Sequence, residues 1–150
     1  MIIFVPQDFI TWANTLMQFP WPIQVDDFAP YAEKLGWKPT LLPDEFSVRP
    51  DNDDEITILS SSEAGNVYKL FLHMAINDAD DVEGAAELND HLVSCVAAGK
   101  KAWGVPFLLE AGDGPSVTWR FPGDMFAQVI SGRWSVLFRF FTPQGKYQFV

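Results

Sequence analysis

His91 and Cys95 lie four residues apart in a segment with helical periodicity, so their side chains would share one face of a helix. This spacing can chelate zinc, but a structural zinc site needs four ligands, and His73 is the only other histidine in the chain. Cys95 falls beside Leu92 and Val96 on the apolar stripe of that helix. We therefore interpret it as an inert core thiol, and not as a zinc ligand or a nucleophile.

The acidic run Asp51-Asn-Asp-Asp-Glu55 invites comparison with a calcium loop. Counted from Asp51, an EF-hand loop requires glycine at its sixth position and glutamate at its twelfth, where this chain has Ile56 and Ser62. The flanking sequence also predicts strands instead of helices. We interpret the run as a solvated hairpin turn, and we predict neither a metal nor a cofactor.

No catalytic motif stands out elsewhere. The chain has no phosphate-binding loop, no nucleophile elbow and no dinucleotide fingerprint, and no one pair of carboxylates is set apart from the others. We therefore predict no catalytic residues and no enzymatic activity. An enzyme or small-ligand binder with a pocket between helix and sheet remains an alternative, with His73, Arg120 or Arg139 as its polar groups.

The charge is unevenly distributed along the chain. Residues 44–90 hold thirteen acids and two bases, whereas residues 100–150 hold three acids and six bases. The net charge of −10 disfavours binding to nucleic acid or to an anionic membrane, because both require basic side chains. It favours a basic protein, a cationic ligand or a divalent ion as partner. The alternative is that the acid only keeps an aromatic-rich protein soluble.

The elements that would position these residues follow from periodicity and turn composition. Spacings of three and four residues predict helices, the last of them capped by the Asn77–Asp81 run, and period-two alternation predicts strands. A capping Asp26 or Asp27 and a terminal Gly36 bound the second helix. The predicted helices are 8–19, 27–35 and 82–99, and the predicted strands are 46–49, 55–60, 67–76, 116–121, 125–131 and 134–141, with residues 144–150 as a further strand or a loose tail.

The composition suits one packed domain. The chain has 150 residues, 48% of them hydrophobic, which is too apolar for intrinsic disorder. We predict a single α+β domain spanning residues 1–150, with an antiparallel sheet packed against helices in the order ααβββαβββ. The single cysteine, the lack of a basic leader and the lack of a long apolar run predict a soluble cytoplasmic protein.

Aromatic residues crowd the last predicted sheet. Phe140 and Phe141 are adjacent and must point to opposite faces, so one of them is exposed or is covered by the first helix. Trp12, Trp21 and Trp103 lie in or near loops and helix ends, where an exposed tryptophan would anchor an interface. The favoured interpretation is that these rings belong to the core.

Three aromatic segments carry a resemblance to known proteins. They are Leu35-Gly-Trp37 after a short helix, Trp119-Arg-Phe-Pro122, and Trp134-Ser-Val-Leu-Phe-Arg-Phe-Phe-Thr-Pro143. In these the chain resembles small acidic actinobacterial proteins that are thought of as immunity proteins encoded beside polymorphic toxins. The order of its elements is also similar to that of type III secretion chaperones. Neither resemblance assigns a role to a particular residue.

Together these observations predict a toxin-neutralising immunity protein that binds a basic toxin domain through an acidic surface and masks its active site. The alternative from the second resemblance is a chaperone that holds an export substrate on an apolar face. The oligomeric state and the identity of the partner stay open. The predicted contact residues are Asp44, Glu45, Asp51, Asp53, Asp54, Glu55 and Glu63, with Asp78, Asp80 and Asp81 as a second cluster.

Overall fold

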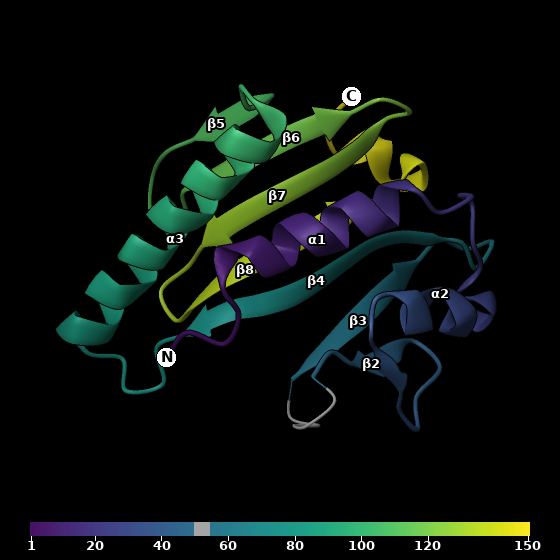
Figure 1. Ribbon diagram of the computed structural model, residues 1–150, viewed down its shortest axis with the longest axis horizontal. Coiled ribbons are helices and arrows are strands. Elements are labelled where there is room, and N and C mark those ends of the chain that lie inside the picture. Colours follow the sequence, from purple (N-terminus) through teal and green to yellow (C-terminus); the bar gives the residue numbers. More distant parts are fainter. Residues whose placement is uncertain (50–54) are drawn as a thin grey trace.

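The strands of the protein form one eight-stranded sheet, which helices cover on one side (Figure 1). The computed structural model describes residues 1–49 and 55–150. All neighbouring strands are antiparallel, so the predicted α+β class is confirmed. In chain order the elements are α1 (Pro6–Met17), the 3-10 helix η1 (Val25–Asp27), α2 (Ala29–Lys34), β1 (Lys38–Pro39), β2 (Glu45–Ser47), β3 (Ile56–Ser61), β4 (Val67–Ile76), α3 (Val82–Trp103), β5 (Leu108–Glu110), β6 (Ser116–Phe121), β7 (Met125–Ser131), β8 (Ser135–Phe141) and the 3-10 helix η2 (Pro143–Gln148).

The sheet consists of two four-stranded meanders that meet at its centre. The strand order is β1-β2-β3-β4-β8-β7-β6-β5, so the first four strands run outward from β4 and the last four run outward from β8. The register between β4 and β8 extends from Lys69 opposite Phe141 to Ile76 opposite Ser135. α3 connects the two meanders, because it carries the chain from the central strand β4 to the outer strand β5.

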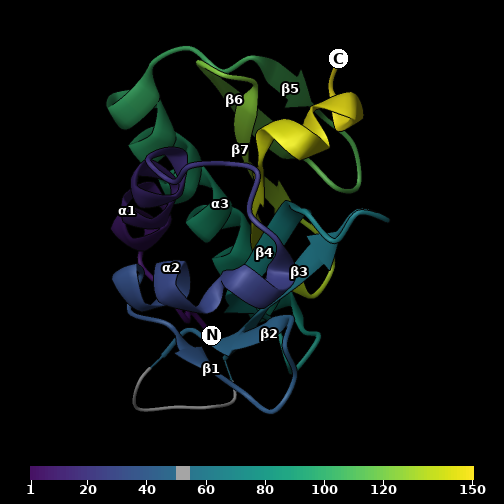
Figure 2. The ribbon, with the colours of Figure 1, turned by 90° about the vertical axis from the view of Figure 1, so that its right-hand side faces the viewer.

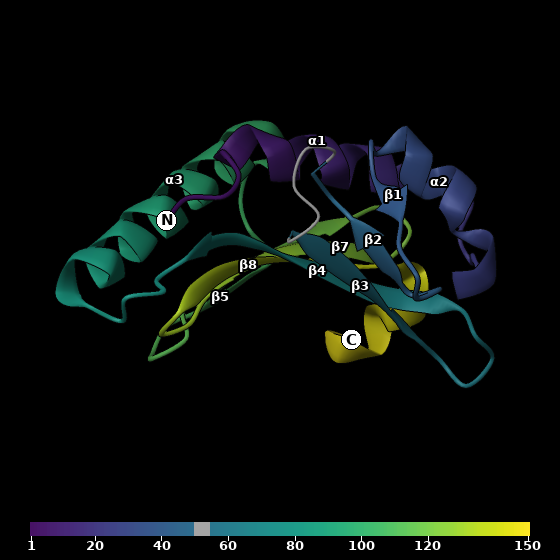
Figure 3. The same cartoon turned by 90° about the horizontal axis from the view of Figure 1, so that it is seen from below.

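The helices α1, α2 and α3 all lie on the same side of the sheet (Figure 3). The side chains of β4 that point toward them alternate along the strand, and Leu70, Leu72 and Met74 are fully buried. Phe138 of β8 lies 5.6 Å, centroid to centroid, from Phe9 of α1. The apolar alternation of the central strands therefore forms the core with the apolar stripes of the helices.

α3 lies so close to β6 that one position of the helix tolerates only glycine. A Cβ atom at Gly99 would collide with the ring of Trp119, which is almost fully buried. The indole of Trp119 donates a hydrogen bond to the carbonyl oxygen of Gly104, at 3.1 Å. This contact fixes the end of α3 above β6 and sets the start of the loop that leads to β5.

The face of the sheet opposite the helices is covered at one end only, by η2 and the last residues of the chain (Figure 2, Figure 3). Thr142 holds η2 in place, since its hydroxyl donates to the carbonyl oxygen of Val67 at 2.8 Å. Phe149 stacks on Phe126 at 4.5 Å and meets Phe141 edge-on at 4.8 Å. The last segment is therefore a 3-10 helix, and neither a strand nor a loose tail.

This arrangement corrects the expectation for the adjacent phenylalanines. Phe140 faces the helices and is fully buried, whereas Phe141 faces the other side and is 4% exposed. Neither ring is exposed, and Phe149, not the first helix, covers Phe141. Tertiary contact with the end of the chain replaces the predicted helix contact.

Several element boundaries also differ from the predicted ones. The helix predicted at 27–35 is divided into η1 and α2, and its N-cap is Phe28, without a side-chain hydrogen bond, instead of Asp26 or Asp27. Gly36 has a φ of +80° directly after that helix, in the conformation expected of a terminal glycine. The short outer strands β1 and β5 were not predicted, because strands of two or three residues show no alternation.

Candidate functional site

The first group of predicted contact residues is spread along one side of the sheet. Asp51, Asp53 and Asp54 lie outside the described residues. Asp44 immediately precedes β2 and its carbonyl oxygen accepts from the backbone of Leu59, while Glu55 immediately precedes β3. The carboxylates of this group therefore lie at opposite ends of the β2–β3 pair and do not converge.

The other two described carboxylates of this group, those of Glu45 and Glu63, belong to different elements. Glu45 begins β2 opposite Ile58 of β3, and Glu63 lies in the turn that connects β3 to β4. Glu63 is exposed, whereas Glu45 is half-buried at the edge of the sheet. The four described carboxylates of the first group are thus spread along β2 and β3 and do not form a compact patch.

Glu55 influences the pKa of His73, which lies on the face of the sheet opposite the helices. Burial lowers the pKa of His73 because it disfavours the imidazolium ion, and the carboxylate of Glu55 opposes this shift. Within the residues that the structure describes, Nδ1 of His73 is buried without a hydrogen-bond partner. This region is therefore electrostatically coupled but offers no converging set of ligands.

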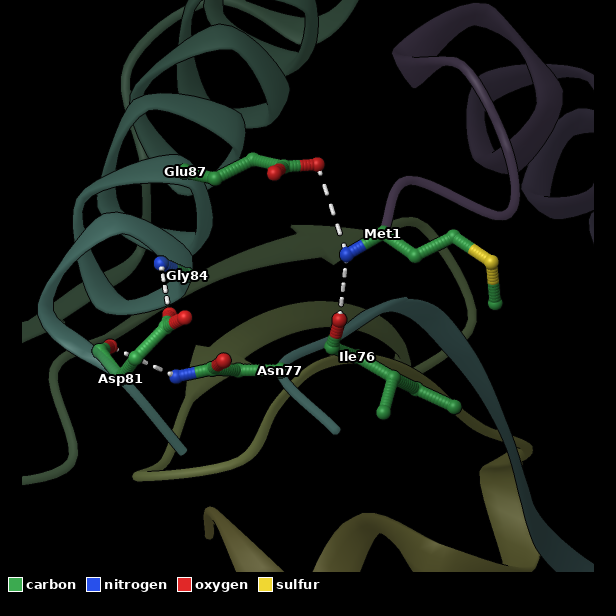
Figure 4. A network of polar contacts seen from close by, with 6 residues as sticks. All are labelled: Met1, Ile76, Asn77, Asp81, Gly84 and Glu87. Atoms are coloured by element: carbon green, nitrogen blue, oxygen red, sulfur yellow. Dashed lines mark hydrogen bonds and ion pairs between the residues drawn. The ribbon is translucent and has the colours of Figure 1, made fainter. Parts of the chain in front are cut away.

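Two members of the second predicted group have structural roles. The carboxylate of Asp81 accepts a hydrogen bond from the backbone of Gly84 at 2.7 Å and so caps α3, while Asn77 donates to the backbone oxygen of Asp81 (Figure 4). Asp80, with a φ of +50°, pairs with the guanidinium of Arg133 through contacts of 3.0 and 2.7 Å. The bond from Arg133 lowers the pKa of Asp80. Capping and pairing therefore account for two of the three predicted contact residues.

The start of α3 brings two predicted contact residues, Asp78 and Asp81, together with three acidic side chains of the helix that were not predicted as contacts. Exposed carboxylates line two adjoining grooves, of about 290 and 480 Å³, beside the N-terminal segment of the chain. We call this set the α3 acidic surface; its members are Asp78, Asp81, Glu83, Glu87 and Asp90. The spacings of three and four residues between its helical members were the signal available in the sequence.

Little positive charge compensates this surface. Over residues 1–49 and 55–150, Asp78, Glu83 and Asp90 make no ion pair. The one ion pair of Glu87 there is with the amino group of Met1, at 3.4 Å, and that group also donates to the carbonyl oxygen of Ile76 (Figure 4). Carboxylates that neighbour each other on a helix repel by a few tenths of a kcal/mol, so this grouping makes the helix slightly less stable. It also concentrates negative potential on one exposed face.

The residues considered first as zinc ligands lie in the interior. Cys95 is fully buried, so its predicted place in the core is confirmed, and burial raises the pKa of its thiol to about 12, which disfavours the reactive thiolate. His91 is 4% exposed, and burial lowers its pKa. In the described part of the chain, no three His, Cys, Asp or Glu residues are grouped so that they could hold a metal ion.

The residues named for a small-ligand pocket share the uncovered sheet face but have separate partners. Arg139 donates to the side chain of Gln128 at 3.4 Å, and Arg120 pairs with Asp124 at 2.6 Å. Neither arginine, nor His73, lines any of the grooves described above. The three side chains therefore do not form a common binding site.

The aromatic residues at helix ends pack inward. Trp12 is 8% exposed and lies against Trp37, while Trp103 packs edge-on against Trp119. Trp21 is half-buried and donates to the backbone oxygen of Leu16. The favoured prediction of core packing is confirmed for these three rings, but it is wrong for Trp134 of the last predicted sheet, which is 57% exposed.

The sequence profile of a family of unknown function (DUF6301) matches residues 7–142. No curated protein matches the chain, and no solved structure matches it. Among the described residues, no helix combines the length and the apolar character that crossing a membrane requires.

Proposed function

The chain belongs to the DUF6301 family of unknown function, and we propose that it acts as a toxin-neutralising immunity protein. In this proposal it binds a basic toxin domain in the cytoplasm through an acidic surface and blocks the toxin's active site without chemistry of its own. The α3 acidic surface is its central contact, and the carboxylates along β2 and β3 contribute at longer range.

The observation that carries the proposal is the grouping of uncompensated carboxylates on one exposed side of α3. Asp78, Glu83 and Asp90 are exposed, and none of them makes an ion pair within the described residues. Domains that act on nucleic acid or nucleotides need cationic clefts to bind phosphate. A rigid acidic helix is complementary to such a cleft, and it would also accelerate the encounter by electrostatic steering.

The test begins with a tagged protein used as bait in lysate of the native host, at low salt and at about 0.5 M salt, where the Debye length falls to about 4 Å. We expect one basic partner that is retained at low salt and released at high salt. Expression of that partner alone should arrest growth, and co-expression with this protein should restore it. A captured partner that does not inhibit growth would refute the toxin assignment.

A matched pair of variants tests the surface itself. The triple reversal Asp78→Lys, Glu83→Lys and Asp90→Lys should weaken binding at least about tenfold and abolish the growth rescue. The control Glu33→Lys, Glu110→Lys and Asp113→Lys changes the net charge equally at exposed positions elsewhere, and it should leave both unchanged. Equal losses from both variants would show that net charge, and not this surface, governs binding.

A further inference from the structure

The outer strand β5 forms one edge of the sheet. Among residues 1–49 and 55–150, β5 pairs with β6 alone, so the backbone groups on its other side have no strand neighbour there. Such an edge can accept an extended chain, which would pair with it through main-chain hydrogen bonds as an added strand. The three residues Leu108–Glu110 contain neither proline nor lysine, which are common devices for blocking an edge.

The opposite edge of the same sheet has those devices. β1 consists of Lys38 and Pro39, and proline has no N–H group to donate to an added strand. α2 packs against β1 as well. β5 is limited by its short length and by the charge of Glu110, but it has neither the proline nor the packed helix that protect β1, so it is the more open of the two edges.

Exposed apolar side chains lie beside the open edge. Val105 is 91% exposed and Leu109 is 66% exposed. Both line a groove of about 460 Å³ together with Lys100, Gly104 and Pro106. Leu109 is in register with Val117, a core residue that faces the helices, so the groove lies on the helix side of the edge.

The floor of this groove is held in place by hydrogen bonds. Gly104 donates to the backbone oxygen of Lys100 at 2.9 Å and accepts from the indole of Trp119 at 3.1 Å. The backbone of Phe107 donates to Thr118 of β6 at 2.8 Å. A groove fixed in this way loses little conformational entropy when a ligand binds.

The charge at this edge determines the chemistry of its occupant. Lys100 lines the groove and Lys101 follows it, and neither makes an ion pair within residues 1–49 and 55–150. At physiological salt, charges interact over only about 8 Å, so a bound segment would sense these lysines more strongly than the distant acidic surface. Glu110 follows Leu109 on β5, is in register with Ser116 and points to the opposite face of the sheet. If a second copy of this chain paired with β5 through its own β5, its Glu110 would therefore not reach the groove.

We propose that β5 binds an extended segment of a partner protein as an added strand, with an apolar side chain in the groove beside Leu109 and a carboxylate at Lys100. This surface lies at the opposite end of α3 from the α3 acidic surface (Figure 1). The inference therefore goes beyond the proposed function and does not depend on it.

The test is an NMR titration of the full chain with the capped peptide Thr-Glu-Thr-Val-Thr-Glu-Thr. In an extended conformation this peptide presents valine between two glutamates on one face, in either strand direction. We expect saturable binding with a Kd on the order of 1 mM, because only a few residues pair. The shifted amide signals should be those of residues 104–110, and the outward amides of β5 should become protected from hydrogen exchange.

Two variants near β5, each with a matched control near β1, distinguish the contribution of the apolar side chain to peptide binding from that of the lysines. Leu109→Ser, or Lys100→Gln with Lys101→Gln, should weaken peptide binding about threefold or more. The controls Leu42→Ser, and Lys34→Gln with Lys38→Gln, make the same changes near β1 and should have no effect on it. The peptide with lysine in place of glutamate should bind at least about threefold more weakly than the glutamate peptide.

Three results would overturn the proposal. One is the absence of saturable binding to the wild-type protein, and a second is equal binding of the glutamate and lysine peptides. The third is a shift of the same β5 signals on concentrating the protein alone, which would assign the edge to self-association. Because no step of this test involves a toxin, its failure would leave the proposed function unaffected.

Discussion

The half of the sheet formed by β1–β4 and the half formed by β5–β8 differ in charge and in the protection of their outer edges. The first half carries the spread carboxylates from Glu45 to Glu63 and ends at Pro39, under α2. The second half belongs to residues 100–150, which carry six of the ten bases of the chain, and it ends at the exposed Leu109. The net charge of −10 therefore averages over an acidic segment and a basic segment.

The two halves of the sheet also differ in the core contacts that lie near each outer edge. Under the first edge, Phe46 packs against Phe28 at 5.6 Å, and nothing in that contact involves the loops at the edge. Under the second edge, Trp119 supports both α3 and the loop at Gly104 that forms the groove. A change in the core should therefore alter the structure of the outer edge in the second half only.

The largest expected effect is that of Trp119→Ala, which tests this distinction. It removes an almost fully buried ring and its hydrogen bond to Gly104, and it should cost about 3–5 kcal/mol of unfolding free energy in urea. Phe46→Ala, in the first half, should cost a similar amount. Under conditions where both variants are folded, only Trp119→Ala should shift the amide signals of residues 104–110. Equal shifts in both variants would contradict the comparison.

The next effect is a loss of stability in acid that arises from one histidine in each region. Burial lowers the pKa of His73, on β4, and of His91, on the helix that covers the second half. As the pH falls below about 6.5, the unfolded chain binds protons that the folded chain does not. The stabilisation is therefore complete above that pH and is lost as the pH falls through the folded pKa values.

Urea unfolding at several pH values between about 7.5 and 5 measures this contribution. It is the part of the slope of unfolding free energy against pH that the two histidines cause. His73→Gln and His91→Gln should each reduce the loss of stability on acidification, and the double variant should reduce it most. A double variant with the same slope as the wild type would show that carboxylates alone cause the acid sensitivity.

The smallest expected effect concerns the blocked edge. Pro39→Val supplies the N–H group that β1 lacks, and it should change the unfolding free energy by no more than about 1 kcal/mol. Light scattering should then show an apparent mass that rises with concentration, beyond any rise seen in the wild type. Pro43→Val, outside the strands, is the matched control. An unchanged mass for Pro39→Val would mean that α2, and not proline, protects this edge.

Local periodicity was sufficient to predict the central strands and the long helix. The alternation of Leu70, Leu72 and Met74 predicted β4 correctly, and the capping role of Asp81 followed from its place before an apolar helical stripe. The length of α3 was underestimated, since the helix was predicted over residues 82–99 and it continues to Trp103. β1 and β5 were missed because two or three residues carry no periodic signal.

The candidate surfaces were predicted less completely than the fold. The acidic segment was visible in the composition, but Asp80 and Asp81 were selected as contacts, although they pair with Arg133 and cap α3. Glu87 and Asp90 were overlooked, since their grouping with Asp78 depends on how the chain turns from β4 into α3. Charge can be counted from the sequence, but a pairing partner 53 residues away cannot.

The sequence by itself determined the α+β class, the core position of Cys95 and the separation of acidic from basic segments, because each depends on side-chain type and short-range spacing. The tertiary structure alone decided which edge of the sheet is blocked, which carboxylates share a groove and how Phe141 is covered. Those features arise where distant segments meet. Their energies depend on contacts that no local pattern encodes.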